Sequence, residues 1–235
     1  MGEVKIAKLH GLRECTILRR INRFVVECLE GGRTIELHLR NTGRLNKLLV
    51  RGFKALYWPK LGGRTLGHLV AVETEGGYAI VDTAVQMSLF ETAIERNVFH
   101  GLEGFEIGGR NVRYASSRFD YLLKKQALEL VLELKSATHV DGSVAMYPDA
   151  PTERGRRHVT ELAHLAERGL RVALCFLAAH PRAESFRVFR EVDEGLYRAV
   201  LRAVESGVDV MALKMAMGKD LTIYARPDSL PIIWP

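Results

Sequence analysis

The sequence predicts a mixed α+β protein made of an all-β small barrel over residues 1–84 and an α/β domain over residues 85–235. Three observations support this prediction. Short β-prone runs separated by glycine turns fill the first part, whereas segments with helical periodicity alternate with apolar strands in the second. The charge also changes along the chain, because residues 1–85 hold 14 Lys and Arg against 8 Asp and Glu, and the remainder holds 20 of each.

The composition argues against a membrane protein and against a disulfide framework. No apolar run approaches the roughly 18 residues of a membrane span, and the first residues, Met-Gly-Glu-Val-Lys, lack the apolar region of a signal peptide. The three cysteines are widely spaced among apolar neighbours, which is typical of reduced core residues. We therefore expect a cytoplasmic protein without membrane contact.

The first domain is expected to contain seven short strands and one short helix. The strands are predicted at residues 4–9, 15–20, 24–29, 34–39, 54–58, 68–73 and 78–81, with glycine-rich turns between them. A helical piece over residues 43–49 interrupts them, with Thr42 as its N-cap. About five strands with one inserted helix fit an OB-like barrel.

Basic residues of this domain gather where the predicted strands end. Arginine presents a planar fork that suits phosphate, so an anionic polymer is the expected partner. The candidate nucleic-acid-binding residues are Arg20, Arg23, Arg40, Asn41, Arg44 and Arg64. Phe24, Tyr57, Trp58 and Tyr78 lie among them and suit either base stacking or core packing. A basic protein that binds no nucleic acid is the alternative.

The second domain begins with a helix predicted over residues 88–98, with Ser88 as its N-cap. Strands are expected at 111–114, 119–123, 128–134, 172–177, 208–215 and 221–225, and helices at 153–168 and 192–205. Thr152 is the expected N-cap of the helix at 153–168. Arg156 and Arg157 lie in its first turns, where the helix dipole disfavours positive charge, so a phosphate is expected there unless this face is solvated.

Acidic residues interrupt the two apolar strands at 119–123 and 128–134, and a lysine directly follows the second. Asp120 lies in the first, and Glu133 and Lys135 lie two apart at the end of the second, so both point to one face. Buried charges are costly unless they are paired. Mg²⁺ or Mn²⁺ bound by Asp120 and Glu133, with Lys135 beside a water, would offset that cost. A surface ion pair between Glu133 and Lys135 is the alternative.

These three residues match the Asp…Glu-x-Lys signature of the PD-(D/E)XK nuclease superfamily. Further motifs are Arg-Arg-Ile-Asn-Arg-Phe at 19–24, Asn-Thr-Gly-Arg-Leu at 41–45 and Pro-Asp-Ala-Pro-Thr-Glu-Arg-Gly-Arg-Arg-His at 148–158. With them, the chain resembles the sugar fermentation stimulation protein family over essentially its full length. The resemblance implies an OB-fold domain followed by a PD-(D/E)XK, restriction-endonuclease-like domain, and DNA binding.

The resemblance also suggests further site residues. Asp120, Glu133 and Lys135 match the catalytic positions, while Asp149 and Glu91 match other acidic positions and are therefore additional metal candidates. Arg20, Arg23, Asn41 and Arg44 match the N-terminal motifs. The chain departs from the expected pattern at Ala84-Val-Gln-Met-Ser, which lacks a Pro-Asn pair.

Three functions remain open from the sequence. The first is metal-dependent phosphodiester hydrolysis on DNA, with Lys135, Glu133 and Asp120 as catalytic residues. The second is a non-catalytic, weakly sequence-selective DNA-binding regulator of sugar metabolism genes. The third is RNA binding. The choice between single-stranded and double-stranded DNA is open, and a homodimer formed through strand edges near the C-terminus is compatible with the sequence.

Overall fold

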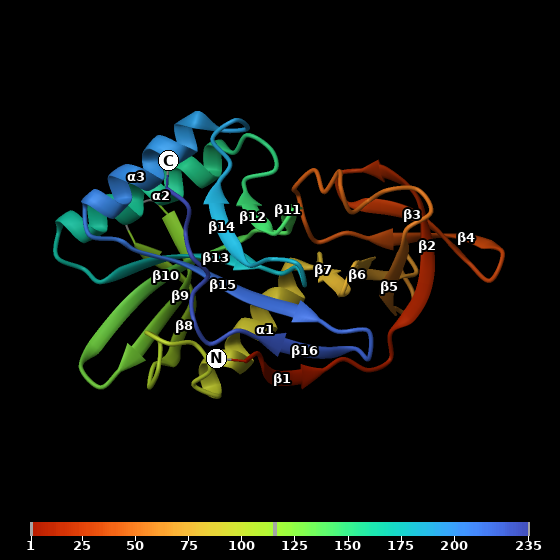
Figure 1. Ribbon diagram of the computed structural model, residues 1–235, viewed down its shortest axis with the longest axis horizontal. Helices are drawn as coiled ribbons and strands as arrows, with labels where there is room; N and C mark the ends of the chain where they lie inside the picture. Colours follow the sequence, from red (N-terminus) through yellow and green to blue (C-terminus); the bar gives the residue numbers. More distant parts are fainter. Residues whose placement is uncertain (1, 115–116, 235) are drawn as a thin grey trace.

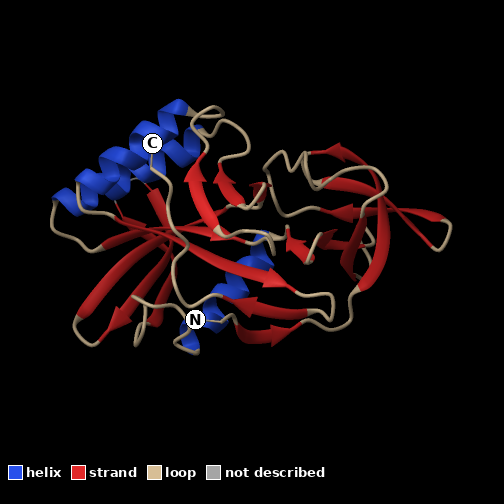
Figure 2. Cartoon of the chain, in the orientation of Figure 1, coloured by secondary structure: helices blue, strands red, loops and turns tan. Residues whose placement is uncertain are grey.

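The computed structural model describes residues 2–114 and 117–234, which form a barrel continued by a helix-covered part of the sheet (Figures 1 and 2). The strands of the first part are β1 Val4–Lys8, β2 Arg13–Asn22, β3 Val25–Glu30, β4 Arg33–His38, β5 Lys54–Pro59, β6 Gly67–Thr74 and β7 Gly77–Ile80. All seven predicted strands of this part are confirmed to within a few residues.

Five of these strands close into a small barrel. Antiparallel pairing joins β4 to β3, β3 to β2, β2 to β5 and β5 to β6, and the ring closes where β4 pairs in parallel with β6. Inward-facing apolar residues of these strands, including Ile17, Val26 and Leu69, form the barrel core. The prediction of an OB-like barrel is confirmed.

The prediction of a helix over residues 43–49 is wrong. The backbone N–H groups of Leu48 and Leu49 both donate to the carbonyl of Leu45, which gives a single hydrogen-bonded turn. Leu45 itself has φ of 53°, a left-handed conformation that a right-handed helix cannot include. Thr42 therefore caps no helix.

The second part is a mixed sheet with helices on both faces. Its elements are α1 Thr83–Glu95, β8 Glu106–Tyr114, β9 Ser117–Lys125, β10 Leu128–Ser136, β11 His139–Asp141, β12 Val144–Tyr147, α2 Glu153–Glu167, β13 Val172–Ala178, β14 Ser185–Val188, α3 Glu194–Glu205, β15 Asp209–Met217 and β16 Thr222–Ala225. In the middle, β13 pairs in parallel with β10 and β15. Apolar residues of α2 and α3 pack in one core and those of α1 in another.

The helix starts are set by their N-caps. α1 begins at Thr83 and not at Ser88, because the Asp82 carboxylate accepts from the N–H groups of Ala84 (2.9 Å) and Val85 (3.2 Å). Thr152 caps α2 as predicted, by accepting from the N–H of Gly155 at 3.0 Å. The small sheet of β11, β12 and β14 was not predicted, because its strands are only three or four residues long.

The two parts share strands. β1 pairs with β16, and the β6–β7 hairpin joins the barrel to β15, so one sheet of 13 strands runs through both parts. The division of the chain at residues 84 and 85 stays a prediction. None of the helices in the described residues is long and apolar enough to cross a membrane.

Candidate functional site

The strands β9 and β10 separate at the predicted acidic residues. Their pairing runs from Leu128 opposite Lys125 to Leu132 opposite Tyr121 and then stops, while β9 stays paired with β8 and β10 with β13. Just beyond the last pair, the N–H of Leu134 donates to Oδ2 of Asp120 at 2.8 Å. The Asp120 side chain thus takes the place of a strand partner, and the opening between the strands begins there.

Glu133 lies on β10 at the same opening and is nearly inaccessible, with 3% of its surface exposed. Its Oε1 accepts two hydrogen bonds, one from Nζ of Lys135 and one from Nδ1 of His158 at 2.7 Å. His158 is buried on α2, with its ring edge against Phe119. The structure therefore confirms that Glu133 and Lys135 share a face, and it adds His158 as a partner of Glu133.

The charges of this cluster shift one another's pKa values. Burial, followed by the charge of Glu133, raises the pKa of Asp120 to about 6. Burial also acts to raise the pKa of Glu133, but the hydrogen bond from His158 and the charge of Lys135 outweigh it, so the pKa is lowered. Burial acts to lower the pKa of Lys135, and the Glu133 carboxylate outweighs it, so the pKa is raised.

One oxygen of this cluster fits a cation. Oε2 of Glu133 is buried and has no hydrogen-bond partner among the described residues. A buried carboxylate oxygen without a partner is costly, and a hard divalent cation is a ligand that would offset this cost. Within the described part of the chain, however, no three His, Cys, Asp or Glu side chains come together as a metal cage. A cation at Asp120 and Glu133 would therefore take its remaining ligands from backbone carbonyls and water.

The other two predicted metal ligands have different partners. Both oxygens of Glu91 accept from Arg110, at 2.8 and 2.7 Å, and one also accepts from the hydroxyl of Tyr121. Oδ2 of Asp149 accepts from the N–H of Leu45 at 2.8 Å. Glu91 thus fixes α1 to β8 and β9, and Asp149 ties the second part to the turn at residues 45–49 of the first.

Two of the predicted nucleic-acid-binding residues are engaged by the backbone. The guanidinium of Arg20 donates to five carbonyls, those of Asn22, Arg23, Asn41, Gly43 and Arg44. Asn41 is buried, donates to the carbonyl of Val81 at 3.0 Å and accepts from the N–H of Gly43 at 2.9 Å. These side chains hold the loop at residues 41–44 in place, which leaves few of their polar atoms for phosphate.

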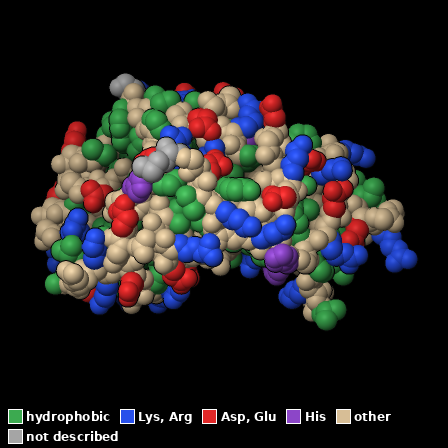
Figure 3. Space-filling model, turned by 60° about the horizontal axis from the view of Figure 1, so that its bottom comes forward, with side chains coloured by type: hydrophobic (Ala, Val, Ile, Leu, Met, Phe, Trp, Pro, Cys, Tyr) green, Lys and Arg blue, Asp and Glu red, His purple; other side chains and the backbone are tan. Residues whose placement is uncertain are grey.

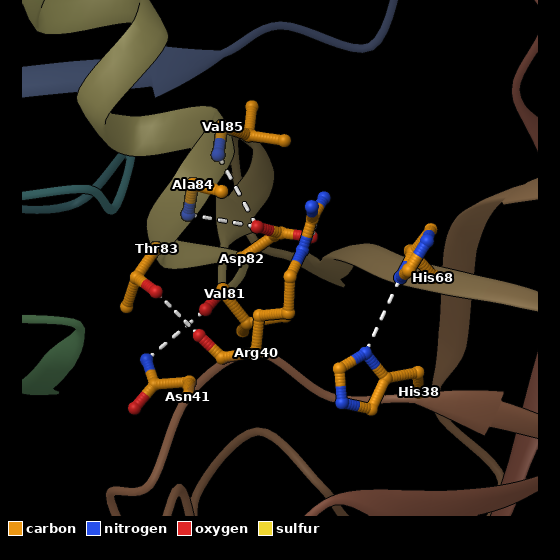
Figure 4. A network of polar contacts seen from close by, with 9 residues as sticks. All are labelled: His38, Arg40, Asn41, His68, Val81, Asp82, Thr83, Ala84 and Val85. Atoms are coloured by element: carbon orange, nitrogen blue, oxygen red, sulfur yellow. Dashed lines mark hydrogen bonds and ion pairs between the residues drawn. The ribbon is translucent and has the colours of Figure 1, made fainter.

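The remaining predicted cations fall into two groups, those that lie beside an acidic residue and those that are exposed. Arg40 pairs with the buried Asp82 at 2.6 Å, beside the cap of α1 (Figure 4), and Arg156 lies 3.4 Å from Asp193. The exposed members are Arg23, Arg44, Arg64 and Arg157. On the face in Figure 3, Lys and Arg side chains lie among Asp and Glu side chains and do not form one continuous basic patch.

A small pocket lies between the barrel and Lys135, and neither Asp120 nor Glu133 lines it. It has a volume of about 290 Å³ and is lined by Arg23 and Arg40 from the first part and by Lys135, Asp149 and Thr152 from the second. A larger cavity of about 750 Å³ shares Thr138 with it. That cavity is lined by both signs of charge, Lys47, Lys54 and Arg182 against Glu73, Glu75 and Asp141.

Known proteins share both parts of this architecture. The family model "SfsA N-terminal OB domain" matches residues 18–81, and the model "Sugar fermentation stimulation protein RE domain" matches residues 84–220. The solved structure of Pyrococcus furiosus SfsA in complex with Ca²⁺ superposes with a TM-score of 0.94 at 36% identity, covering 98% of this chain and all of that one.

Curated relatives agree with these matches. A sugar fermentation stimulation protein homolog from Archaeoglobus fulgidus is 40% identical over 230 residues, which is 98% of this chain and 100% of the relative. The homolog from Pyrococcus furiosus is 38% identical over 214 residues, which is 91% of this chain and 93% of the relative. The chain belongs to the sugar fermentation stimulation protein family.

Proposed function

We propose that this protein binds a divalent cation, Mg²⁺ or Mn²⁺, at Asp120 and Glu133 and hydrolyses phosphodiester bonds in DNA. The observation that carries the proposal is the buried Oε2 of Glu133, which has no partner among the described residues and lies where β9 and β10 separate. The Ca²⁺ complex of the Pyrococcus furiosus relative supports a site for a hard divalent cation in this family.

The residues of the chain have distinct roles in this proposal. Asp120 and Glu133 hold the cation, which supplies Lewis-acid polarisation of a phosphate oxygen when bound. Lys135 lines the small pocket and has a raised pKa, so it stays protonated and presents positive charge to a phosphate there. Arg23 in the same pocket is exposed and extends this positive charge to a neighbouring phosphate.

The test is cleavage of end-labelled single- and double-stranded DNA in Mg²⁺ or Mn²⁺ by wild type and by the Glu133→Ala and Lys135→Ala variants. We expect cleavage by wild type and a loss of about 10²-fold or more in both variants, because Glu133 holds the cation and Lys135 presents its charge to the phosphate. Glu129→Gln is the matched control, since Glu129 lies on the same strand, is exposed and pairs with Lys124.

Cleavage that persists in Glu133→Ala would rule out this site. Binding of DNA without cleavage by any of these proteins, wild type included, would instead support the second candidate function, a weakly sequence-selective DNA-binding regulator that makes no use of the cluster for turnover.

A further inference from the structure

The tip of the β2–β3 hairpin exposes two large apolar side chains. Ile21 is 41% and Phe24 is 50% exposed. Of the four aromatic residues that the sequence places among the basic residues of the barrel, Tyr57 and Tyr78 are buried and Nε1 of Trp58 donates to the carbonyl of His10. Phe24 is thus the aromatic ring of this group that remains free to contact a partner.

The exposed ring sits on a rigid support. The N–H of Phe24 donates to Oδ1 of Asn22 at 2.8 Å, and its carbonyl accepts from the N–H of Leu39 at 2.8 Å. The guanidinium of Arg20 holds the carbonyl of Arg23 next to it, at 2.8 Å. The backbone that carries the ring is therefore fixed and loses little further conformational freedom when the ring contacts a partner.

The hairpin tip borders the candidate site. Arg23 lines the small pocket together with Lys135, and its guanidinium carbon lies 5.8 Å from the centroid of the Phe24 ring. The Arg23 guanidinium thus lies over the Phe24 ring, so a positive charge for a phosphate and an aromatic ring for a base adjoin at the rim. The pocket volume of about 290 Å³ is at the lower end of small-ligand pockets, which suits a group no larger than about one nucleotide.

Resting on the proposed function, we infer that the site takes single-stranded DNA, with one base stacked on Phe24 and an adjacent phosphate at Arg23. Base–aromatic stacking is the interaction by which proteins hold single strands, and it needs an unpaired base whose face is accessible. In a duplex that face is covered by neighbouring base pairs. A duplex would offer only its phosphates to Arg23 and would leave the apolar tip exposed.

The experiment measures equilibrium binding in EDTA, so that no cleavage occurs, using fluorescein-labelled 20-mer thymidine and uridine oligonucleotides and a 20-base-pair duplex. The proteins are wild type, Phe24→Ala, Phe24→Trp and Leu61→Ala. Leu61 is the matched control, because it is a fully exposed apolar residue in the loop between β5 and β6.

We expect wild type to bind the thymidine oligonucleotide more tightly than the duplex, and Phe24→Ala to weaken this binding by about fivefold or more. Phe24→Trp and Leu61→Ala should bind it like wild type. Equal or tighter binding of the duplex or of the uridine oligonucleotide, or an unchanged affinity in Phe24→Ala, would overturn the inference. Because these readouts need neither metal nor turnover, they are independent of the Glu133→Ala cleavage test of the proposed function.

Discussion

Asp120 is a half-buried acid whose charge is only partly compensated by its neighbours. Its pKa is raised to about 6 from an ordinary value of 3.8, so the folded state binds the proton more tightly than the unfolded state does. This group therefore adds to the free energy of unfolding. Its contribution is fully present below about pH 4 and is lost as the pH rises through about 6. At 1.36 kcal/mol per pKa unit, the loss is up to about 3 kcal/mol.

We predict that Asp120→Asn stabilises the metal-free protein at pH 8 by about 1–3 kcal/mol and has little effect at pH 4. The asparagine keeps an oxygen for the N–H of Leu134 and removes the charge. Urea unfolding in EDTA at both pH values measures this difference. A variant that is less stable than wild type at pH 8 would show that the Asp120 charge is well compensated, in conflict with the raised pKa.

His158 is predicted to act by orienting Glu133. Its Nδ1 fixes Oε1, which leaves Oε2 for the cation. We expect His158→Leu to weaken Mn²⁺ binding about 10- to 100-fold, the usual effect of losing a group that orients a metal ligand. His158→Asn should retain most of the affinity, because its amide nitrogen lies close to the position of Nδ1. Calorimetric titration with Mn²⁺ measures both variants, and equal affinities for them would contradict an orienting role.

At the level of the elements, the sequence predicts those helices, strands and caps that are determined by residues close together in the chain. The strand runs of the barrel, the Thr152 cap and the Glu-x-Lys strand were predicted because alternation, turns and caps are local signals. Three-dimensional contacts decide the rest. Asp82 caps α1 while it is buried against Arg40, a residue 42 positions earlier in the chain, and no local signal distinguishes it from Ser88 as the cap.

The same limit applies to the site residues. Arg20 is predicted from the sequence to bind phosphate. In the structure its guanidinium donates to backbone carbonyls 21 to 24 positions away, as well as to those of near neighbours in the chain. His158 directly follows Arg156 and Arg157 in the chain and is not among the predicted site residues. However, His158 lies four residues before Leu162 and seven before Leu165, on the apolar face of the helix. This spacing indicates that His158 is buried and needs a polar partner.

At the level of the whole molecule, the first strand belongs structurally with the last. β1 pairs with β16, and Ile6, 1% exposed, packs in the same core as residues of α1, β10 and β13. Nearby, Glu3 forms an ion pair with the buried Lys214 of β15 at 2.9 Å. The N-terminal residues therefore stabilise the part of the protein that carries Asp120 and Glu133, although the barrel lies between them in the chain.

We predict that Ile6→Ala lowers the free energy of unfolding of the entire protein by about 2–4 kcal/mol, the usual cost of a cavity at a buried isoleucine. Val4→Ala is the matched control, because Val4 is on the same strand but 41% exposed, and it should cost far less. Since one sheet continues from the barrel through β7 to β15, both parts should unfold in a single calorimetric transition that shifts as a whole. Two transitions, of which Ile6→Ala moves only one, would instead mean that the barrel folds independently and that the continuous sheet does not couple it to the site.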